Sequence, residues 1–296
     1  MKLRWKIKQP LFKYWAVVPT ILILVVLTLY PVLQLVRMSV SDIEYVEGQM
    51  EWTFVGMKNL RTMLKDSVVP VAIKNTLTYV ILVVFIESFL GLILAFLVNQ
   101  VKRFATAFRA ILMLPLLIPP VAIGSIWRLL YDYNYGAINK ILALVGLSGP
   151  AWLANPNLAF PAVVVVDIWH WTSFMFLIML AGVTSIPVGL YEAARVDGAS
   201  EFKVYWKIVM PLMSKTIIVG MMLRTIFAFK VFDQIYLLTS GGPGTTTEVI
   251  SMYIYKVFFG QFRLGYGSLL ALVLAIIMVI FVIVYRVTIL KVGKEV

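Results

Sequence analysis

Residues suited to ligand recognition recur at helical spacing between positions 167 and 174. Asp167, His170, Trp171 and Phe174 follow the pattern i, i+3, i+4, i+7, which places two polar groups and two aromatic rings on one helix face. Aromatic faces cover the C–H patches of a polyhydroxyl ligand, while polar side chains exchange hydrogen bonds with its hydroxyls. A polyhydroxyl ligand would therefore suit this face, and no covalent chemistry is predicted.

A second group of candidate site residues follows further along the chain. Arg224 and Phe227 share a helical face, and Gln234 comes after them. At about 1.5 Å per residue, Asp167 and His170 lie roughly 14 to 18 Å from one end of their helix, and Arg224 lies at a matching depth. The alternative is that Asp167 and Arg224 only neutralise each other between packed helices, and that His170 is an interhelical hydrogen-bonding residue.

The elements that must position these side chains are membrane helices. The chain has 296 residues, of which 61% are hydrophobic and 14% charged, and its mean hydropathy is +0.94. A helix needs about 20 apolar residues to cross a bilayer. Six such runs predict an all-α integral membrane protein with a single transmembrane domain over residues 1–296. The runs cover residues 15–36, 76–98, 110–130, 158–183, 212–238 and 268–285.

Two of the six runs carry further signals. Pro115, Pro119 and Pro120 should kink the third run, because proline removes a backbone donor and clashes with the preceding turn. Glu87 is an isolated acid in the second run, and we expect it to pack against another helix rather than to bind substrate.

The basic residues give the predicted orientation. Lys and Arg are dense in residues 1–14, 99–109, 184–215 and 286–296 and sparse in the three other connections. This alternation is the positive-inside pattern, and it places both termini in the cytoplasm. It also accounts for the net charge of +12 without a nucleic-acid partner. The first apolar run continues with bulky residues past the length of a signal peptide, so we interpret it as a retained anchor.

The sequence lacks the residues for a metal site and for a nucleotide-binding loop. The sequence has no cysteine and one histidine, which leaves too few ligands for a metal site. No phosphate-binding G-x-x-x-x-G-K-[ST] loop is present, because "SGGPGTTTE" has the glycines without the lysine. We read that stretch as a turn before a short outer segment, so this motif gives the chain no nucleotide-binding site of its own.

The connection between the fourth and fifth runs, about residues 188–211, is longer than a simple helix-to-helix loop. Its sequence predicts two short helices, with Gly198 ending the first and Ser200 capping the second. In the second helix, Phe202, Tyr205 and Trp206 form an apolar stripe that can lie in the membrane interface. A plain interfacial helix pair is therefore one interpretation of this loop.

The same loop resembles a family signature. The pattern is Glu192-Ala193-Ala194, three residues, Gly198, nine residues, Ile208, one residue, Met210-Pro211. This resembles the EAA motif of the membrane-spanning subunits of binding-protein-dependent ABC importers, with methionine where the motif has leucine before proline. "LPLLIPPVAIGSIWRLLYDYNYGAIN" and "FDQIYLLTSGGPGTTTE" resemble its carbohydrate-uptake branch, the maltose-permease-F-like and glycerol-phosphate-permease-A-like proteins.

The resemblance implies a coupling helix that docks on a separate ATPase. Glu192, Ala193, Ala194 and Gly198 would be the docking residues. Arg195 and Asp197 add charge around the flat surface that the two alanines leave.

The resemblance also implies partners and a location. It implies a second permease, preferably a different one, two ATP-binding cassette subunits that hold ATP and Mg²⁺, and an extracytoplasmic solute-binding protein. This chain itself would bind no cofactor and would lie, surrounded by lipid, in the cytoplasmic (inner) membrane. Its substrate would be a sugar, polyol or sugar-phosphate, moved by alternating access.

Two alternatives from other classes remain open. An ion-coupled secondary carrier would use carboxylates near the midplane, such as Asp167 and Glu87. An intramembrane enzyme would depend on His170.

Overall fold

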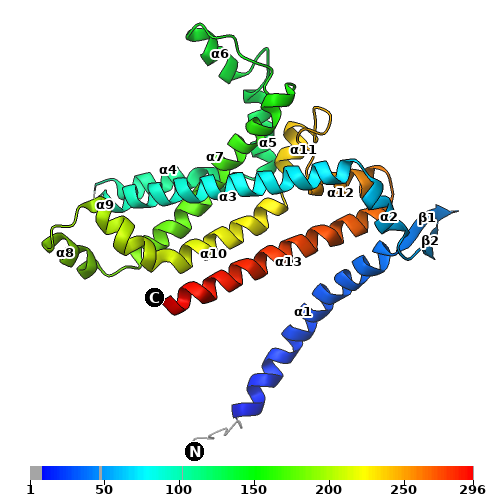
Figure 1. Cartoon of the computed structure of the whole chain (residues 1–296), viewed down its shortest axis with the longest axis horizontal. Helices are drawn as coiled ribbons and strands as arrows, with labels where there is room; N and C mark the ends of the chain where they lie inside the picture. The colour runs from blue at the N-terminus through cyan, green and yellow to red at the C-terminus, as the bar shows by residue number, and fades with distance from the viewer. Residues whose placement is uncertain (1–8, 47–48, 102, 296) are drawn as a thin grey trace, which may run out of the picture. The chain divides into compact units, whose positions relative to one another are not determined.

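The computed structural model describes residues 9–46, 49–101 and 103–295 (Figure 1). The described chain divides into two compact units. One comprises the residues up to Lys65 together with Ile254–Val273, and the other comprises Asp66–Tyr253 together with the residues from Leu274 onward. Lys2, Arg4, Lys6 and Lys8, on which the orientation prediction partly rests, lie outside the described residues.

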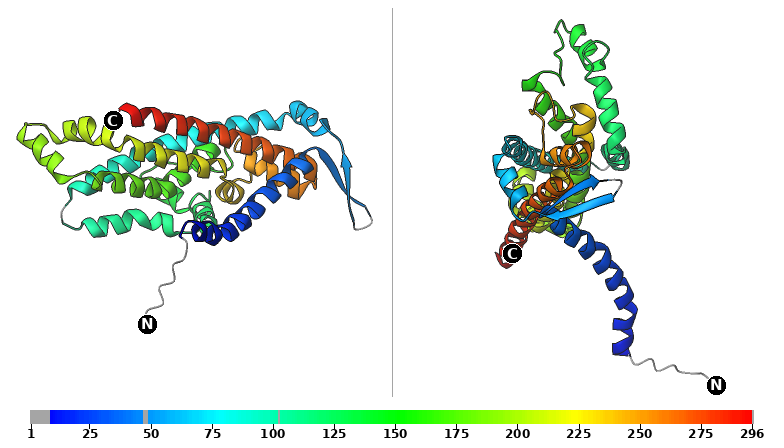
Figure 2. Two further views of the ribbon diagram at one scale, coloured as in Figure 1. Left: turned by 90° about the horizontal axis from the view of Figure 1, so that it is seen from below. Right: turned by 90° about the vertical axis from the view of Figure 1, so that its right-hand side faces the viewer.

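The first unit contains a β-hairpin that the sequence analysis did not predict. Helix α1 (Gln9–Ser39) leads into strand β1 (Ser41–Val46), which pairs antiparallel with β2 (Gln49–Phe54), so that Ser41 faces Phe54 (Figure 2). Helix α2 (Lys58–Lys65) follows, and the unit also holds the π-helical turn η2 (Lys256–Gly260) and the start of α13 (Leu264–Glu295).

Buried polar contacts fix the base of the hairpin. The Asn59 side-chain amide donates to the carbonyls of Ser39 and Ser41, at 2.9 and 3.1 Å. Gly265 at the start of α13 lies so close that a Cβ there would be 1.9 Å from the Ser41 carbonyl oxygen. Lys58 donates to Asp42 at 2.8 Å, and this hydrogen bond raises the Lys58 pKa above its ordinary value.

The second unit is built on α3 (Val68–Gln100), α7 (Pro156–Thr184) and α10 (Met210–Phe229). The three helices pack against one another, and small residues let their backbones approach closely (Figure 1). A Cβ on Gly91 of α3 would lie 2.8 Å from the main chain of Met175 on α7, so only glycine fits at this crossing.

The third predicted span is a broken helix, as its prolines indicated. Helices α4 (Ala105–Leu117) and α5 (Pro120–Leu130) meet at an angle of 92°. Ile118 and Pro119 each precede a proline, which disfavours helical dihedrals, and both have extended ψ values of 127° and 139°.

The fifth predicted span differs from the structure at both ends. It begins earlier, because α9 (Glu201–Val204) and the π-helical turn η1 (Tyr205–Val209) run directly into α10. It also ends earlier, at Phe229, and the predicted continuation to residue 238 is wrong. The chain breaks over residues 230–232, and Ser251 donates its hydroxyl to the freed carbonyl of Val231.

Short helices complete the second unit. The "SGGPGTTTE" stretch forms a turn, as predicted, and Asn75 of α3 donates its side-chain amide to three of its carbonyls at 2.9–3.2 Å. The remaining elements are α6 (Ala137–Leu144), α8 (Val188–Val196), α11 (Asp233–Leu238) and the start of α12 (Ile250–Tyr255), which belongs to this unit as far as Tyr253. By length and composition, five described helices could cross a membrane, or six if the bent pair α4–α5 is one span.

Candidate functional site

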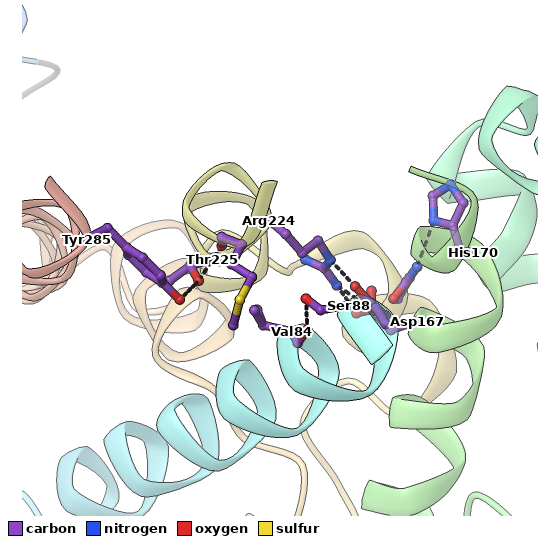
Figure 3. Close-up of polar contacts among 10 residues, drawn as sticks. Val84, Ser88, Asp167, His170, Arg224, Thr225 and Tyr285 are labelled. Carbon is purple, nitrogen blue, oxygen red and sulfur yellow. Dashed lines mark hydrogen bonds and ion pairs between the residues drawn. The ribbon is translucent and has the colours of Figure 1, made fainter. Parts of the chain in front are cut away.

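A buried ion triad joins the three central helices of the second unit. Arg224 on α10 donates to both oxygens of Glu87 on α3, from Nε at 2.5 Å and from Nη2 at 3.0 Å, and Nη2 also contacts Asp167 on α7 (Figure 3). The three side chains are at most 2% exposed. Two formal negative charges therefore surround one formal positive charge.

One contact of the triad was predicted from the sequence and one was not. Asp167 and Arg224 are in contact, as the neutralisation alternative requires. Glu87 packs between helices as expected, but its partner Arg224 was not predicted. The available signal was the charge count: a guanidinium inside an apolar span calls for compensating acids, and Glu87 is the one acid in the second predicted span.

An aromatic cluster covers one side of the triad. Arg224 lies 4.8 Å from the centre of the Trp171 ring, a cation–π distance. Trp171 stacks on Phe227 with centroids 5.2 Å apart, and Phe174 meets both rings edge-on. The spacing of these aromatic residues predicts that they lie on the faces of two helices, and the structure brings the two faces together.

His170 and Gln234 form a polar pair beside the aromatic cluster. Gln234 Nε2 lies 3.2 Å from His170 Nδ1, and both side chains are buried. The break after Phe229 makes this contact possible, because it allows α11 to start in a new direction and bring Gln234 against α7. The carboxamide oxygen of Gln234 is buried without a hydrogen-bond partner among the described residues.

Part of this group lines one cavity of about 160 Å³, whereas Glu87, His170 and Phe174 are not among its lining residues. Asp167, Trp171, Arg224, Phe227 and Gln234 line it, and Lys230 and Asp233 lie at its rim. Such a cavity combines aromatic faces with hydrogen-bonding groups, which suits binding of a small polar ligand. Over the part of the chain that the structure describes, no group of three or more His, Asp or Glu side chains is placed to hold a metal ion.

The loop between α7 and α10 contains the turn that its sequence predicts. Gly198 has φ +73°, its amide donates to the Arg195 carbonyl at 3.0 Å, and the Ala199 amide donates to the Ala194 carbonyl at 2.9 Å. This is the Schellman arrangement that ends a helix with glycine. Ser200 then caps α9, accepting from the Lys203 amide at 3.4 Å.

The candidate coupling residues divide into exposed and buried groups. Glu192, Ala193, Arg195 and Asp197 are exposed, and Arg195 forms a 2.8 Å ion pair with Glu201. The side chain of Ala194 is only 6% exposed and packs into the apolar core of the unit, so in the isolated chain it is not a surface residue.

The predicted aromatic stripe is also divided, and this corrects the sequence interpretation. Phe202 and Trp206 are exposed and stacked, with centroids 6.1 Å apart. Tyr205 is buried against Phe96, at a centroid distance of 4.4 Å. Only Phe202 and Trp206 are free to lie in a membrane interface, because the Tyr205 side chain packs inward from η1 against α3.

The family comparison matches residues 87–292, a range that holds the triad, the cavity and the coupling loop. The matching family is described as the inner membrane component of binding-protein-dependent transport systems. The chain belongs to this family. Its members translocate a solute without catalysing a reaction, so family membership decides against the ion-coupled carrier and the intramembrane enzyme.

Individual relatives cover nearly the whole chain. The trehalose/maltose transport system permease protein of Thermococcus litoralis is 35% identical over 291 residues, which is 98% of this chain and 96% of the relative. The sulfoquinovosyl glycerol transport system permease protein of Agrobacterium fabrum is 36% identical over 256 residues, covering 86% and 83% of the two chains.

A solved structure agrees with the fold of this family member. A chain of a bacterial ABC transporter for the acidic polysaccharide alginate superposes with a TM-score of 0.83 and 26% identity, covering 96% of this chain and 97% of that one. A chain from a bacterial alginate ABC transporter in complex with an alginate pentasaccharide-bound periplasmic protein superposes with a TM-score of 0.82 and 26% identity. The chain is therefore the inner-membrane permease of a binding-protein-dependent ABC importer.

Proposed function

We propose that this permease carries a sugar, polyol or sugar-phosphate across the inner membrane, with the cavity beside the triad as its recognition site. One observation carries the proposal: the stacked rings of Trp171 and Phe227 line the same cavity as the side chain of Gln234. The stack offers faces for C–H groups, and the polar side chains in the lining can exchange hydrogen bonds with hydroxyls. The names of the relatives, which refer to trehalose, maltose and alginate, support the same substrate class.

Removing the indole of Trp171 tests the recognition site. We expect Trp171→Ala to raise the half-saturating sugar concentration for ATP-driven uptake by at least about tenfold, because the stacking face is lost. The measurement is uptake of radiolabelled trehalose and maltose by proteoliposomes that contain the assembled transporter and its binding protein.

Trp169→Ala is the matched control. Trp169 is two residues away on α7, is 41% exposed, and contacts Trp127 instead of the cavity. Equal losses in both variants would mean that Trp171 stabilises the helix and does not contact sugar, and the recognition site would have to be elsewhere.

The loop of α8 and α9 is proposed to dock on the ATPase subunit, which would bind ATP and Mg²⁺. Its exposed face holds Glu192 and Ala193, and the short alanine side chain lets another surface approach the backbone. The loop connects α7, which holds Asp167, to the helix that continues into α10, which holds Arg224. Motion of a docked partner would therefore move two of the three helices that form the triad.

Enlarging Ala193 tests the docking. We expect Ala193→Arg to reduce the ATPase that co-purifies in mild detergent by about tenfold, because an exposed flat contact is replaced by a long charged side chain. Lys203→Ala, an exposed change on α9, is the control and should leave co-purification unchanged. Normal ATPase recovery with Ala193→Arg would rule out docking at this face.

The complete importer is proposed to contain a second, different permease, two ATPase subunits and a solute-binding protein outside the membrane. The alginate transporter is a relative that meets such a periplasmic protein. Both termini and the α8–α9 loop are proposed to be cytoplasmic, as the distribution of Lys and Arg indicates.

A further inference from the structure

We propose that a groove between α3 and the helix formed by α9 and η1 binds one phospholipid with an anionic headgroup. The groove has a volume of about 480 Å³, and its lining is apolar or aromatic except for Gln100. It shares no lining residue with the cavity beside the triad, so this site is additional to the proposed sugar site. Only the assignment of the lipid to the cytoplasmic leaflet rests on the proposed orientation of the chain.

The two walls of the groove are exposed apolar surfaces. On α3, Phe89, Ile93 and Leu97 follow i, i+4, i+8 and share one helix face, with exposed fractions of 53, 37 and 55%. On the opposite wall, Phe202 and Trp206 are 76% and 54% exposed and stack on each other with centroids 6.1 Å apart. Burying such surface against hydrocarbon is favourable, and leaving it in water is not. An apolar chain is therefore the ligand that these walls fit.

A buried contact fixes the two walls relative to each other. The ring of Tyr205 on η1 lies 4.4 Å from that of Phe96 on α3, centroid to centroid, and its hydroxyl accepts from the Asn99 side-chain amide at 3.5 Å. Tyr205 is 7% exposed and belongs to the apolar core of the unit. The groove is therefore a fixed feature of the second unit, because packed side chains join its walls.

The length of the groove matches one leaflet of a bilayer. Phe89 and Gln100 are 11 positions apart on α3, which is about 16 Å at about 1.5 Å per residue. The hydrocarbon core of a bilayer is about 30 Å thick, so the groove extends over about half of it. Its one polar lining residue lies at the end of α3, and Trp206 is of the type that gathers at membrane–water interfaces. An acyl chain along the groove would thus place its headgroup near Gln100.

Two cations adjoin the lining residues at this end of the groove. Arg103 follows Gln100 by three residues, Lys207 directly follows Trp206, and both side chains are exposed. Among the described residues neither forms an ion pair with an acid, whereas Glu201, the acid of α9, is already paired with Arg195. Basic residues at the cytoplasmic surface attract acidic lipids. A zwitterionic headgroup carries its own cation beside the phosphate and gains less from Arg103 and Lys207, so the site favours an anionic phospholipid.

The test is photolabelling of the assembled permease and ATPase complex in phosphatidylcholine nanodiscs. Each preparation contains an equal small amount of one photoactivatable lipid, either phosphatidylglycerol or phosphatidylcholine, with a diazirine in one acyl chain. Mass spectrometry locates the labelled residues. We expect phosphatidylglycerol to label residues 89–97 and 202–206 at least about fivefold more than phosphatidylcholine does. Both leaflets carry the probe, so the result does not depend on the orientation of the chain.

Three outcomes are distinguishable. Preferential labelling of the groove by phosphatidylglycerol supports the proposal. Equal labelling by the two lipids would overturn it, because the headgroup would then not be recognised. Labelling elsewhere on the chain with none in the groove would also overturn it, and would mean that a helix of another subunit covers this surface. The sugar site is unaffected by either result, since it has different lining residues.

A pair of charge variants tests the headgroup contact. We expect Arg103→Gln with Lys207→Gln to reduce the preference for phosphatidylglycerol to about twofold or less. Lys65→Gln with Lys140→Gln removes the same charge from exposed residues that adjoin no lining residue, and should leave the preference unchanged. Equal losses in the two double variants would mean that overall charge, and not this site, attracts the lipid.

A pair of tryptophan variants tests the acyl-chain contact. Leu97→Trp fills the groove with a larger ring, and we expect it to lower labelling of residues 202–206 by both lipids at least about fivefold. Ile81→Trp is the matched control, because Ile81 is 60% exposed on α3 and does not line the groove. Unchanged labelling in Leu97→Trp would place the lipid outside the groove. A size-exclusion profile of each variant shows that the complex is assembled before labelling is compared.

Discussion

Replacing Arg224 by methionine is expected to lower the free energy of unfolding by about 3–5 kcal/mol, the usual result of removing one member of a buried ion pair. The reason is that Glu87 and Asp167 would face each other at 0–2% exposure without a counter-charge. The measurement is the thermal unfolding midpoint of the detergent-solubilised protein, followed by tryptophan fluorescence.

The matched control removes all three charges. In Glu87→Met with Asp167→Leu and Arg224→Met, no carboxylate is left unpaired, and apolar side chains of similar size often replace a buried ion cluster without loss of stability. We expect the triple variant to regain most of the lost unfolding temperature. A triple variant that is less stable than Arg224→Met alone would show that the triad contributes net stability, contrary to this expectation.

Replacing Gly91 by leucine is expected to prevent close packing of α3 and α7. A Cβ at this position would lie 2.8 Å from main-chain atoms of Met175 and Phe176, and main chain cannot move aside as a flexible side chain can. Overpacking of this kind costs about 1–3 kcal/mol and more where backbone must shift. We expect the amount of folded protein in the membrane to fall about tenfold, measured by size-exclusion chromatography of a fluorescent fusion.

Gly189→Ala is the control for this substitution. Gly189 also lies in a helix, and a Cβ there would have no neighbour within 4 Å. Alanine favours helix over glycine, so this variant should be recovered at or above the wild-type level. A normal chromatographic profile for Gly91→Leu would contradict the close approach of the two helices.

Local signals allowed the sequence to predict several features correctly. The proline pair at Pro119 and Pro120 predicted a break, and Gly198 and Ser200 predicted the turn and cap between two short helices. In each case the geometry is set within four or five residues, through a missing donor, a left-handed φ or a side chain that reaches its own backbone.

Features that depend on distant partners were missed. The break after Phe229 has no proline or glycine to mark it, and it is stabilised by Ser251 and by the contact of Gln234 with His170. The partner of Glu87 lies 137 residues away. The hairpin does carry a local signal, because apolar residues alternate along "DIEYV" and "QMEWTF". This alternation is short and weak beside the long apolar runs that dominate the chain.

The order of the three charged helices along the chain gives the triad a consequence for biosynthesis. Glu87 leaves the ribosome 137 residues ahead of Arg224, an interval of roughly 7–27 s at about 5–20 residues per second. An unpaired charge at the centre of a span opposes insertion by about 2.5–3.5 kcal/mol, and each large aliphatic residue offsets about 0.3–0.6 kcal/mol of this.

Of the three helices, α3 is the most apolar, and the helix ending at Phe229 is the least apolar. Glu87, the first of the three charged residues to be synthesised, therefore lies on α3, whose apolar residues favour insertion into the bilayer without a partner helix. Arg224, on the helix least able to insert alone, is synthesised last and enters a membrane in which both of its counter-charges are already in place.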